Sequence, residues 1–311
     1  MISLIIPVYN EAYNLASLNS KVIETLGRLG KEYEVVYVDD NSIDDSYKLL
    51  EGFADSDSNV RAIRLARNFG QTLAIQAGID NSVGDIIIIM DADLQNDPAD
   101  IPRLLQKIEE GYDVVSGWRR HRKDPLFNKK IPSFIGNRLI SLLFKIDIHD
   151  LGCSLKAYKR NVIANMRLYG EMHRLLPLYA AMRGASIAEV EVSHNPRIKG
   201  RTHYGWSRIF KVTLDLITIR FFEKYSTKPI YFFGNLGMGI FMAGLTMGAL
   251  VVVRKVFFHG VWVSPLLFVS LMCIMMGINL VLMGLLAEII IRIYYKSQTE
   301  HTYLTKEKDI R

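Results

Sequence analysis

The sequence predicts an α/β fold with a mostly parallel sheet, followed by a C-terminal two-helix transmembrane hairpin. In the N-terminal part of the chain, runs of apolar, β-branched residues alternate with amphipathic helical patterns. The apolar runs are nearly continuous, which is typical of strands buried on both faces of a parallel sheet. Near the C-terminus, two long segments carry no charge. The chain is therefore expected to combine a soluble domain with a membrane part.

Each expected strand ends at polar residues, and a helical pattern follows it. The expected strands are 2–8, 34–38, 60–65, 85–90 and 113–116. The expected helices are 14–29, 44–53, 71–79 and a fourth that starts at 97 or 98 and ends at 110. In parallel sheets, ligands bind beyond the carboxyl ends of the strands, so the polar residues at these ends are candidate site residues.

Two amphipathic segments, 132–145 and 206–225, mix aromatic and aliphatic residues with basic ones. Helices of this composition lie in the membrane interface, where basic residues meet headgroups and aromatic residues dip below them. The alternative is a pair of ordinary helices packed on the soluble domain. The neighbouring membrane segments favour the interfacial interpretation.

The uncharged segments 230–253 and 263–287 are each about 24 residues long, enough to cross a hydrocarbon core of roughly 30 Å. A short connection makes them a hairpin. Basic residues outside the hairpin outnumber Arg254 and Lys255 between the spans, so the soluble part is expected on the cytoplasmic face. The expected domains are a soluble domain with its interfacial helices (1–228), a membrane hairpin (229–295) and a cytoplasmic tail (296–311), in the cytoplasmic (inner) membrane.

Composition excludes several other classes of protein. The formal charge is +6, but no nucleic-acid-binding signature accompanies the basic clusters, so nucleic acid is not an expected partner. Cys153 and Cys273 are too far apart in sequence to suggest a disulfide framework or zinc site, and both are expected to be semi-buried, inert thiols. The N-terminus lacks the features of a secretory signal. His149, His194 and His203 lack metal-ligand spacing and are expected on the surface or in loops.

Asp91 and Asp93 follow an Ile-rich run that is predicted to be a buried strand. Residues two apart on a strand project to the same side, so both carboxylates are expected to face one cation. Hard carboxylate oxygens suit Mg²⁺ or Mn²⁺, whose coordination is completed by waters and substrate phosphates. The alternative for an Asp-X-Asp sequence is a solvated turn, but a buried strand gives little other reason for two charges at its end.

Three motifs in order, Ile5-Ile6-Pro7-Val8-Tyr9-Asn10-Glu11, Val38-Asp39-Asp40-Asn41-Ser42 and Asp91-Ala92-Asp93-Leu94-Gln95, resemble those of the family-two GT-A glycosyltransferases. Within that family the chain is similar to the polyprenyl-phosphate glycosyltransferases over nearly its whole length, including the hairpin. The resemblance implies a Rossmann-like GT-A fold. It also implies transfer of one sugar from a UDP- or GDP-linked donor to a polyprenyl phosphate, and it is compatible with a homo-oligomer.

The resemblance also implies roles for individual residues. It assigns the nucleotide-sugar to Pro7, Tyr9, Glu11, Asp39, Asp91 and Gln95, and the Mg²⁺ or Mn²⁺ ion to Asp91, Asp93 and Gln95. It assigns catalytic roles to Asp91, Asp93, Asp150, Arg119 and Arg201, of which Arg119 is the donor-side arginine and Arg201 belongs to a loop that closes over the phosphates. The acceptor phosphate falls to Lys129, Lys130, Ser133 and Asn137.

The residue types agree with these roles. Arginine provides forked donors for phosphate oxygens, and a helix N-terminus preceded by lysines favours an anion. A phosphate monoester acceptor is already ionised at neutral pH, so Asp150 is expected to be an orienting or electrostatic group rather than a base. Its alternative is a helix or turn cap. The alternative for the basic residues is a merely solvated surface position.

Two other functions remain open at this stage. A processive polysaccharide synthase could share the fold, although the sequence lacks a Gln-X-X-Arg-Trp segment and two spans are too few for a channel. A non-catalytic membrane scaffold that binds nucleotide is the other alternative, and it would show no turnover that substitution of Asp91 or Asp93 could abolish.

Overall fold

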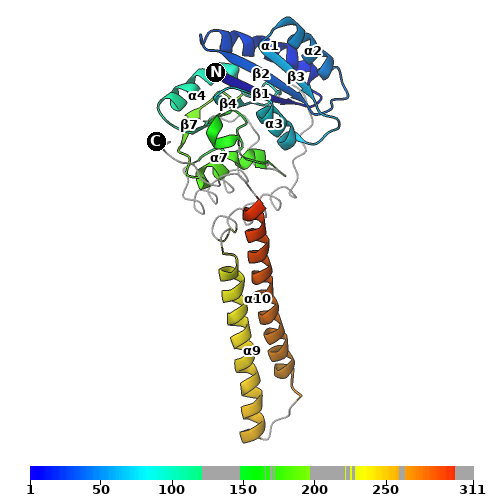
Figure 1. The fold of residues 1–311 in the computed structure, drawn as a ribbon, viewed down its shortest axis with the longest axis vertical. Coiled ribbons are helices and arrows are strands. Elements are labelled where there is room, and N and C mark those ends of the chain that lie inside the picture. The colour runs from blue at the N-terminus through cyan, green and yellow to red at the C-terminus, as the bar shows by residue number, and fades with distance from the viewer. Residues whose placement is uncertain are drawn as a thin grey trace. The chain divides into compact units, whose positions relative to one another are not determined.

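The computed structural model describes residues 1–120, 148–164, 166–168, 170, 172–196, 221, 225, 228–258 and 263–297. These residues belong to two compact units, one built around a sheet and one containing two long helices (Figure 1). Apart from Phe221 and Tyr225, the two expected interfacial helices lie outside the described residues.

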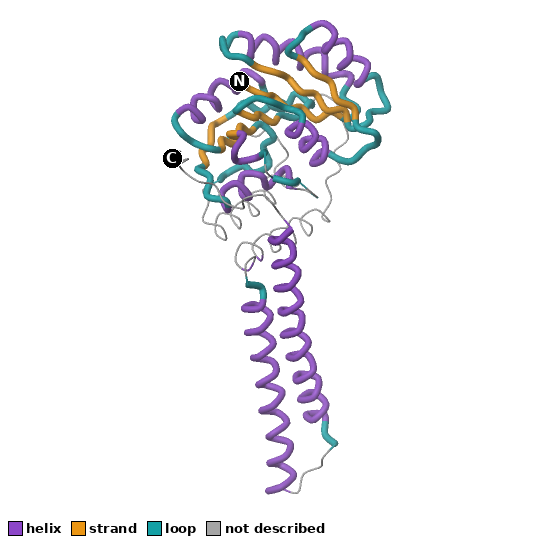
Figure 2. Tube along the Cα trace, viewed as in Figure 1, coloured by secondary structure: helices purple, strands orange, loops and turns teal. Residues whose placement is uncertain are grey.

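The first unit alternates strands and helices, as the sequence predicts (Figure 2). The predicted elements are present with bounds shifted by a few residues, and β6, α6, α7 and β7 come in addition. In chain order they are β1 (Ile2–Val8), α1 (Ala12–Gly27), β2 (Tyr33–Asp39), α2 (Ser46–Ser56), β3 (Val60–Arg64), α3 (Gln71–Asp80), β4 (Ile86–Ile89), η1 (Pro98–Asp100), α4 (Ile101–Glu109), β5 (Val114–Trp118), β6 (Lys156–Lys159), α6 (Arg160–Ile163), α7 (Met172–Met182) and β7 (Ile187–Glu191).

The strands form one sheet in the order β3-β2-β1-β4-β6-β5-β7. All described pairings are parallel except those of β6, which runs antiparallel to both β4 and β5. The pairing of β1 with β4 reaches only Ile5 opposite Ile89, whereas β1 continues beside β2 until Val8 is opposite Asp39. The strand order reverses at β1 and β4, which is the position where such sheets bind ligands.

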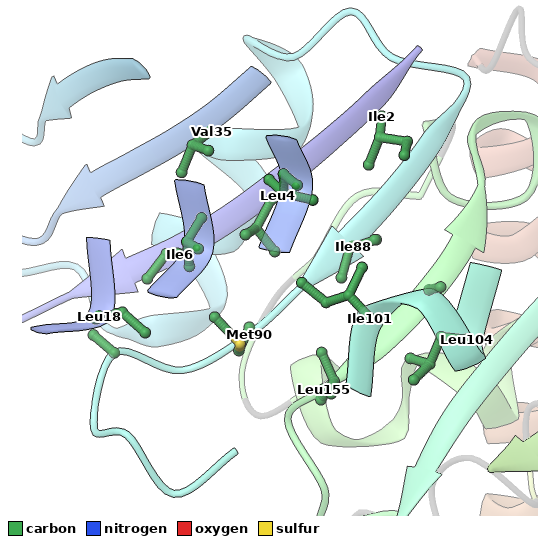
Figure 3. Close-up of a cluster of buried hydrophobic side chains, with 14 of the residues drawn as sticks. Ile2, Leu4, Ile6, Leu18, Val35, Ile88, Met90, Ile101, Leu104 and Leu155 are labelled. Carbon is green, nitrogen blue, oxygen red and sulfur yellow. The ribbon is translucent and has the colours of Figure 1, made fainter. Parts of the chain in front are cut away.

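Helices cover both faces of the sheet. On one face, alternate residues of β1, among them Leu4 and Ile6, pack with Leu18 of α1 and with Ile101 and Leu104 of α4 (Figure 3). All five side chains are fully buried. Burial of an aliphatic side chain of this size contributes about 1.5–3 kcal/mol, so this layer is a major source of the domain's stability.

The opposite face carries a second core. Ile5 of β1 and Ile87 of β4 pack there with Ile75 of α3 and Leu176 of α7. Side chains that alternate between two cores explain why the strands read as continuous apolar runs, because neither face meets water. The prediction of a mostly parallel sheet with helices on both sides is confirmed.

The second unit consists of α9 (Ile230–Phe258) and α10 (Pro265–Ser297). Both are long and apolar enough to cross a membrane, and only 17% and 11% of their most apolar windows are buried, unlike the core helices of a soluble protein. The helices extend past the expected ends of the spans at residues 253 and 287. At 1.5 Å per residue, a helix of 29 residues is about 44 Å long, so it reaches beyond the hydrocarbon core.

The two long helices approach each other closely at glycines. A Cβ added at Gly237 would lie 2.7 Å from the carbonyl oxygen of Gly277, and the reverse is also true. One heptad away, Ser270 donates a hydrogen bond of 2.8 Å to the Gly244 carbonyl oxygen. Small residues allow such contacts, and tight van der Waals packing is what holds helices together in lipid. The expected hairpin is therefore a packed pair.

Candidate functional site

The loops that follow β1 and β2 are joined to each other at the carboxyl edge of the sheet. The Asn10 backbone N–H donates to Ser42 Oγ at 2.9 Å, and the Ile43 N–H donates to Asn10 Oδ1 at 2.9 Å. Asn10 and Asn41 adopt left-handed backbone conformations with φ of 57° and 58°. Asparagine tolerates this conformation better than most residues, which makes it suitable for both turns.

The four residues assigned to the nucleoside lie at this edge. Pro7 is buried in β1 and is paired with Val38, while Tyr9 follows the strand and is 47% exposed. Glu11 precedes α1, and its carboxylate accepts a hydrogen bond from the Asn14 side chain at 2.6 Å. Asp39 is fully buried at the end of β2. The parallel pairing of β1 and β2 therefore brings these residues to one side of the site.

The loop before α3 is attached to the end of β2. Asp40 is buried, and its two carboxylate oxygens accept hydrogen bonds from the backbone N–H groups of Phe69 and Gly70 at 2.7 and 2.8 Å. The next residue, Gln71, begins α3 and donates from Nε2 to Asp91 Oδ1 at 2.6 Å. Asp40 therefore fixes the start of the helix from which Gln71 reaches Asp91.

Asp91 and Asp93 do not lie on a strand, so the strand-based reason for their common direction is wrong. β4 ends at Ile89, and both aspartates lie in the bend that follows. Within this bend Leu94 has a φ of 59°, a conformation that costs a residue with a Cβ of order 1–2 kcal/mol. Asp93 Oδ1 accepts a hydrogen bond from the Gln95 backbone N–H at 3.1 Å. The bend, rather than strand alternation, orients the two carboxylates.

The two carboxylates are close enough to repel each other electrostatically. Burial, followed by the charge of Asp93, raises the pKa of Asp91 to about 6, against the opposing effects of a hydrogen bond from Ser154 and the charges of Lys156 and Arg119. Burial also lowers the pKa of Lys156 to about 8. An acidic pair that is costly to ionise is a suitable site for a cation, because the cation removes the repulsion.

Lys156, in β6, is buried beneath this site. Its Nζ donates to the Leu151 carbonyl oxygen at 3.0 Å, which ties β6 to the segment before it. Cys153 is fully buried nearby, and burial raises the pKa of its thiol to about 11. The expectation of an inert thiol is supported, although Cys153 is buried more completely than expected.

Arg119 and Asp150 form a buried ion pair. Arg119 Nε donates to Asp150 Oδ2 at 2.7 Å, and Nη2 donates to Oδ1 at 3.0 Å. Only 8% of the Arg119 side chain and 4% of the Asp150 side chain are exposed. A Cβ added at Gly152 would lie 3.2 Å from Arg119 Nη2, so glycine leaves room for the pair. Asp150 binds this arginine through its side chain, which favours the orienting role over a simple cap.

The described residues provide an incomplete metal shell by themselves. Among them, no group of three or more His, Cys, Asp and Glu side chains could hold a metal ion. Asp91 and Asp93 would provide two carboxylates, and Mg²⁺ usually completes such a shell with waters and substrate phosphates. The two carboxylate donors and the repulsion between their charges therefore fit a divalent cation that arrives with a diphosphate.

Several predicted site residues lie outside the described part of the chain. They are Lys129, Lys130, Ser133, Asn137 and Arg201. Of the histidines, His203 is also outside it, Nδ1 of His149 lies 2.7 Å from a Glu189 carboxylate oxygen, and His194 lies in a loop but is only 9% exposed. The structure therefore brings together the predicted donor side of the site.

Sequence reasoning missed Gln71, Ser154, Lys156 and Glu189. Gln71 follows the third strand's loop at the same edge of the sheet, so the rule that located Asp91 could have found it. Lys156 and Ser154 belong to β6 or its approach, and Glu189 belongs to β7. Neither strand was predicted, and no spacing in the sequence indicates that these residues reach the site.

Comparison with known proteins identifies relatives along the whole chain. The model of the family described as Glycosyl transferase family 2 matches residues 3–167. The chain is 37% identical over 316 residues to dodecaprenyl-phosphate galacturonate synthase of Rhizobium johnstonii, with 98% of this chain and 92% of the relative covered. It is 36% identical over 311 residues to undecaprenyl-phosphate 4-deoxy-4-formamido-L-arabinose transferase of Shewanella sediminis, with 98% and 92% covered.

Solved structures share the fold of the first unit. Mannosyl-3-phosphoglycerate synthase from Rubrobacter xylanophilus has a TM-score of 0.57 at 14% identity, with 72% of this chain and 74% of that chain covered. Glucosyl-3-phosphoglycerate synthase from Mycobacterium tuberculosis, in complex with Mn²⁺, uridine diphosphate and glucosyl-3-phosphoglycerate, has a TM-score of 0.54 at 17% identity, covering 71% and 79%. At these identities the likeness concerns the fold alone, which is the predicted GT-A type.

Proposed function

The chain belongs to glycosyl transferase family 2, and we propose that it transfers one sugar from a nucleoside-diphosphate sugar to a polyprenyl phosphate. Its relatives over 98% of its length are polyprenyl-phosphate sugar transferases, one for galacturonate and one for 4-deoxy-4-formamido-L-arabinose. The donor is a UDP- or GDP-linked sugar, and the acceptor is a lipid such as undecaprenyl phosphate. The product is a polyprenyl-phosphate sugar for modification of the cell envelope.

The observation that carries this proposal is the acidic pair at the point where the sheet reverses. Asp91 and Asp93 follow β4 where it separates from β1, and Gln71 holds Asp91 from the side of α3. Arg119 and Lys156 place positive charge near Asp91. A site with acids for a cation and bases for phosphate oxygens suits a diphosphate leaving group.

A divalent cation, Mg²⁺ or Mn²⁺, would be held by Asp91, Asp93 and Gln95. When bound, it would neutralise the charge that develops on the departing diphosphate. Pro7, Tyr9, Glu11 and Asp39 would bind the nucleoside at the adjacent edge, which leaves the sugar directed toward the acceptor. Arg119, held by Asp150, and Arg201 would contact the diphosphate oxygens.

The acceptor needs no general base, because a phosphate monoester already carries charge near neutral pH. A phosphate oxygen attacks the anomeric carbon from the side opposite the leaving group, the bond to the diphosphate breaks, and the configuration inverts. Lys129 or Lys130, with Ser133 and Asn137, would orient the acceptor phosphate. Positioning supplies most of the catalysis in this scheme.

The proposed domains follow from the same scheme. Residues 1–228 form the catalytic domain with two interfacial helices, 229–295 form the membrane hairpin, and 296–311 form the tail. The basic residues that flank the hairpin support a cytoplasmic catalytic domain on the inner membrane. A membrane anchor is useful because the lipid acceptor stays in the bilayer.

The test is transfer by the purified full-length protein in nanodiscs. Labelled UDP- and GDP-sugars are supplied separately with undecaprenyl phosphate and Mg²⁺ or Mn²⁺, and the organic phase is counted. A single labelled sugar on the lipid that vanishes in Asp93→Ala supports the proposal. A long water-soluble polymer would indicate a processive synthase, and no turnover with any donor would indicate a scaffold; either result overturns the proposal.

A further inference from the structure

Glu189 of β7 holds the segment that carries Asp150. Both of its carboxylate oxygens accept from the His149 backbone N–H, at 2.9 and 3.0 Å, and Oε1 also accepts from the Asp150 N–H at 3.1 Å. The His149 ring adds a contact from Nδ1 to Oε2 at 2.7 Å. Only 9% of the Glu189 side chain is exposed. One carboxylate therefore binds two successive backbone N–H groups, those of His149 and Asp150.

Other contacts hold the same segment from different strands. The His149 ring stacks on Trp118 of β5, with centroids 4.5 Å apart and an interplanar angle of 22°. Lys156 of β6 donates to the Leu151 carbonyl oxygen at 3.0 Å. Among these contacts, only those of Glu189 involve the backbone of Asp150 itself. Of these residues, Glu189 is therefore the one best placed to fix the position of the Asp150 carboxylate.

The position of Asp150 in turn sets that of Arg119. The carboxylate binds both Nε and Nη2 of the guanidinium, at 2.7 and 3.0 Å, and it also accepts from the Arg119 backbone N–H at 3.3 Å. A bidentate pair of this kind fixes the plane of the guanidinium. A shift of the Asp150 backbone would therefore be passed on to the arginine.

We propose that Glu189 is a positioning residue for sugar transfer, which acts by holding Asp150 and through it Arg119. The inference rests on the proposed function, in which Arg119 contacts the donor diphosphate. The Glu189 carboxylate accepts hydrogen bonds from the backbone N–H groups of His149 and Asp150, so its effect on transfer would pass through Asp150. A misplacement of about 1 Å in a catalytic group can cost of order 100-fold in rate, so loss of the Glu189 contacts should be visible in kinetics.

The test compares three variants of the full-length protein in nanodiscs. Glu189→Ala removes all the contacts and is expected to lower kcat/KM for the nucleotide-sugar about 100-fold, with the KM for polyprenyl phosphate unchanged. Glu189→Gln keeps one acceptor oxygen and should lose about 10-fold. The matched control is Glu191→Gln, which alters a partly exposed residue of the same strand that pairs with Arg120 and should change kcat/KM less than about 2-fold.

A double-mutant cycle separates positioning from general stability. If Glu189 acts through Asp150, Glu189→Ala should lower kcat/KM less than about 3-fold in an Asp150→Asn background. In that background the ionic hold of Asp150 on Arg119 is already lost, so misplacing residue 150 has little further effect. Equal losses in both backgrounds, or wild-type kinetics for Glu189→Ala, would overturn the inference. Failure of the proposed function would look different, because the wild-type protein would then transfer no sugar to lipid. Full activity of Asp150→Asn would instead overturn the inference, since Glu189 could not then act through Asp150.

Discussion

Asp91→Asn is expected to stabilise the fold while it abolishes sugar transfer. Burial and the charge of Asp93 raise the pKa of Asp91 to about 6 from an ordinary value of 3.8. At 1.36 kcal/mol per pKa unit, ionised Asp91 costs the folded protein at most about 3 kcal/mol. Asparagine has nearly the same shape, carries no charge and can still accept the hydrogen bond from Gln71. The substitution therefore removes an electrostatic destabilisation that is present in the folded wild-type protein.

The gain should depend on pH in a defined direction. Below about pH 4, Asp91 is protonated in the folded and the unfolded chain, so wild type and variant should be equally stable. Because the folded pKa is the higher one, wild type loses stability relative to the variant as pH rises from about 4 to about 6. Above pH 6 the difference should be constant.

The assay is thermal unfolding of the full-length protein in detergent with EDTA, between pH 4 and pH 8. For a domain of this size, 1 kcal/mol shifts Tm by about 2–4 °C, so the gain at pH 7.5 has an upper bound of about 6–12 °C. Asp55→Asn, at an exposed position of α2, is the control and should change stability less than about 0.5 kcal/mol. An equal or lower Tm for Asp91→Asn at pH 7.5 would refute the electrostatic reasoning.

Three further outcomes are expected. EDTA should abolish transfer, and Mg²⁺ or Mn²⁺ should restore it, as measured by labelled lipid; full activity in EDTA would exclude the metal. Glu34→Ala should lower the free energy of unfolding by about 1–3 kcal/mol at pH 7. Burial raises the pKa of Glu34, but hydrogen bonds from Ser3 and Val83 outweigh it and lower the pKa, so the ionised carboxylate stabilises the fold. The loss of stability should become smaller below about pH 4, because protonation of Glu34 then removes the stabilisation that its carboxylate gives the wild-type protein. Gly277→Leu should lower the detergent stability of the hairpin, whereas Gly239→Leu, which has open space around it, should not.

The sequence predicted the strands that are apolar on both faces. β4 is a run of four isoleucines, and β1 and β2 are mostly apolar; polar turns follow all three, and each formed a central strand. β6 and β7 were missed because Lys156–Lys159 and Ile187–Glu191 mix charged with apolar residues. Lys156 is buried, and its Nζ donates a hydrogen bond to the Leu151 carbonyl oxygen. The periodicity of the sequence does not predict such a contact.

The sequence predicted which residues belong to the site better than it predicted how they are arranged. Asp91 and Asp93 were located correctly at the carboxyl edge, but a bend with Leu94 at φ 59° orients them, rather than strand alternation. Arg119 and Asp150 were each assigned to the site, yet their direct pairing was not foreseen, because 31 positions separate them in the chain.

By itself, the sequence determined the class of fold, the two long apolar helices and the edge of the sheet where the polar site residues lie. The spacing of apolar residues and the length of apolar runs determine these properties, because both depend only on residues that are close together in the chain. Only the tertiary structure decided that Gln71 reaches Asp91, that Asp150 binds Arg119, and that Glu189 supports Asp150. These contacts join strands and loops far apart in the chain, and their energies depend on burial and distance that exist only after the sheet has formed.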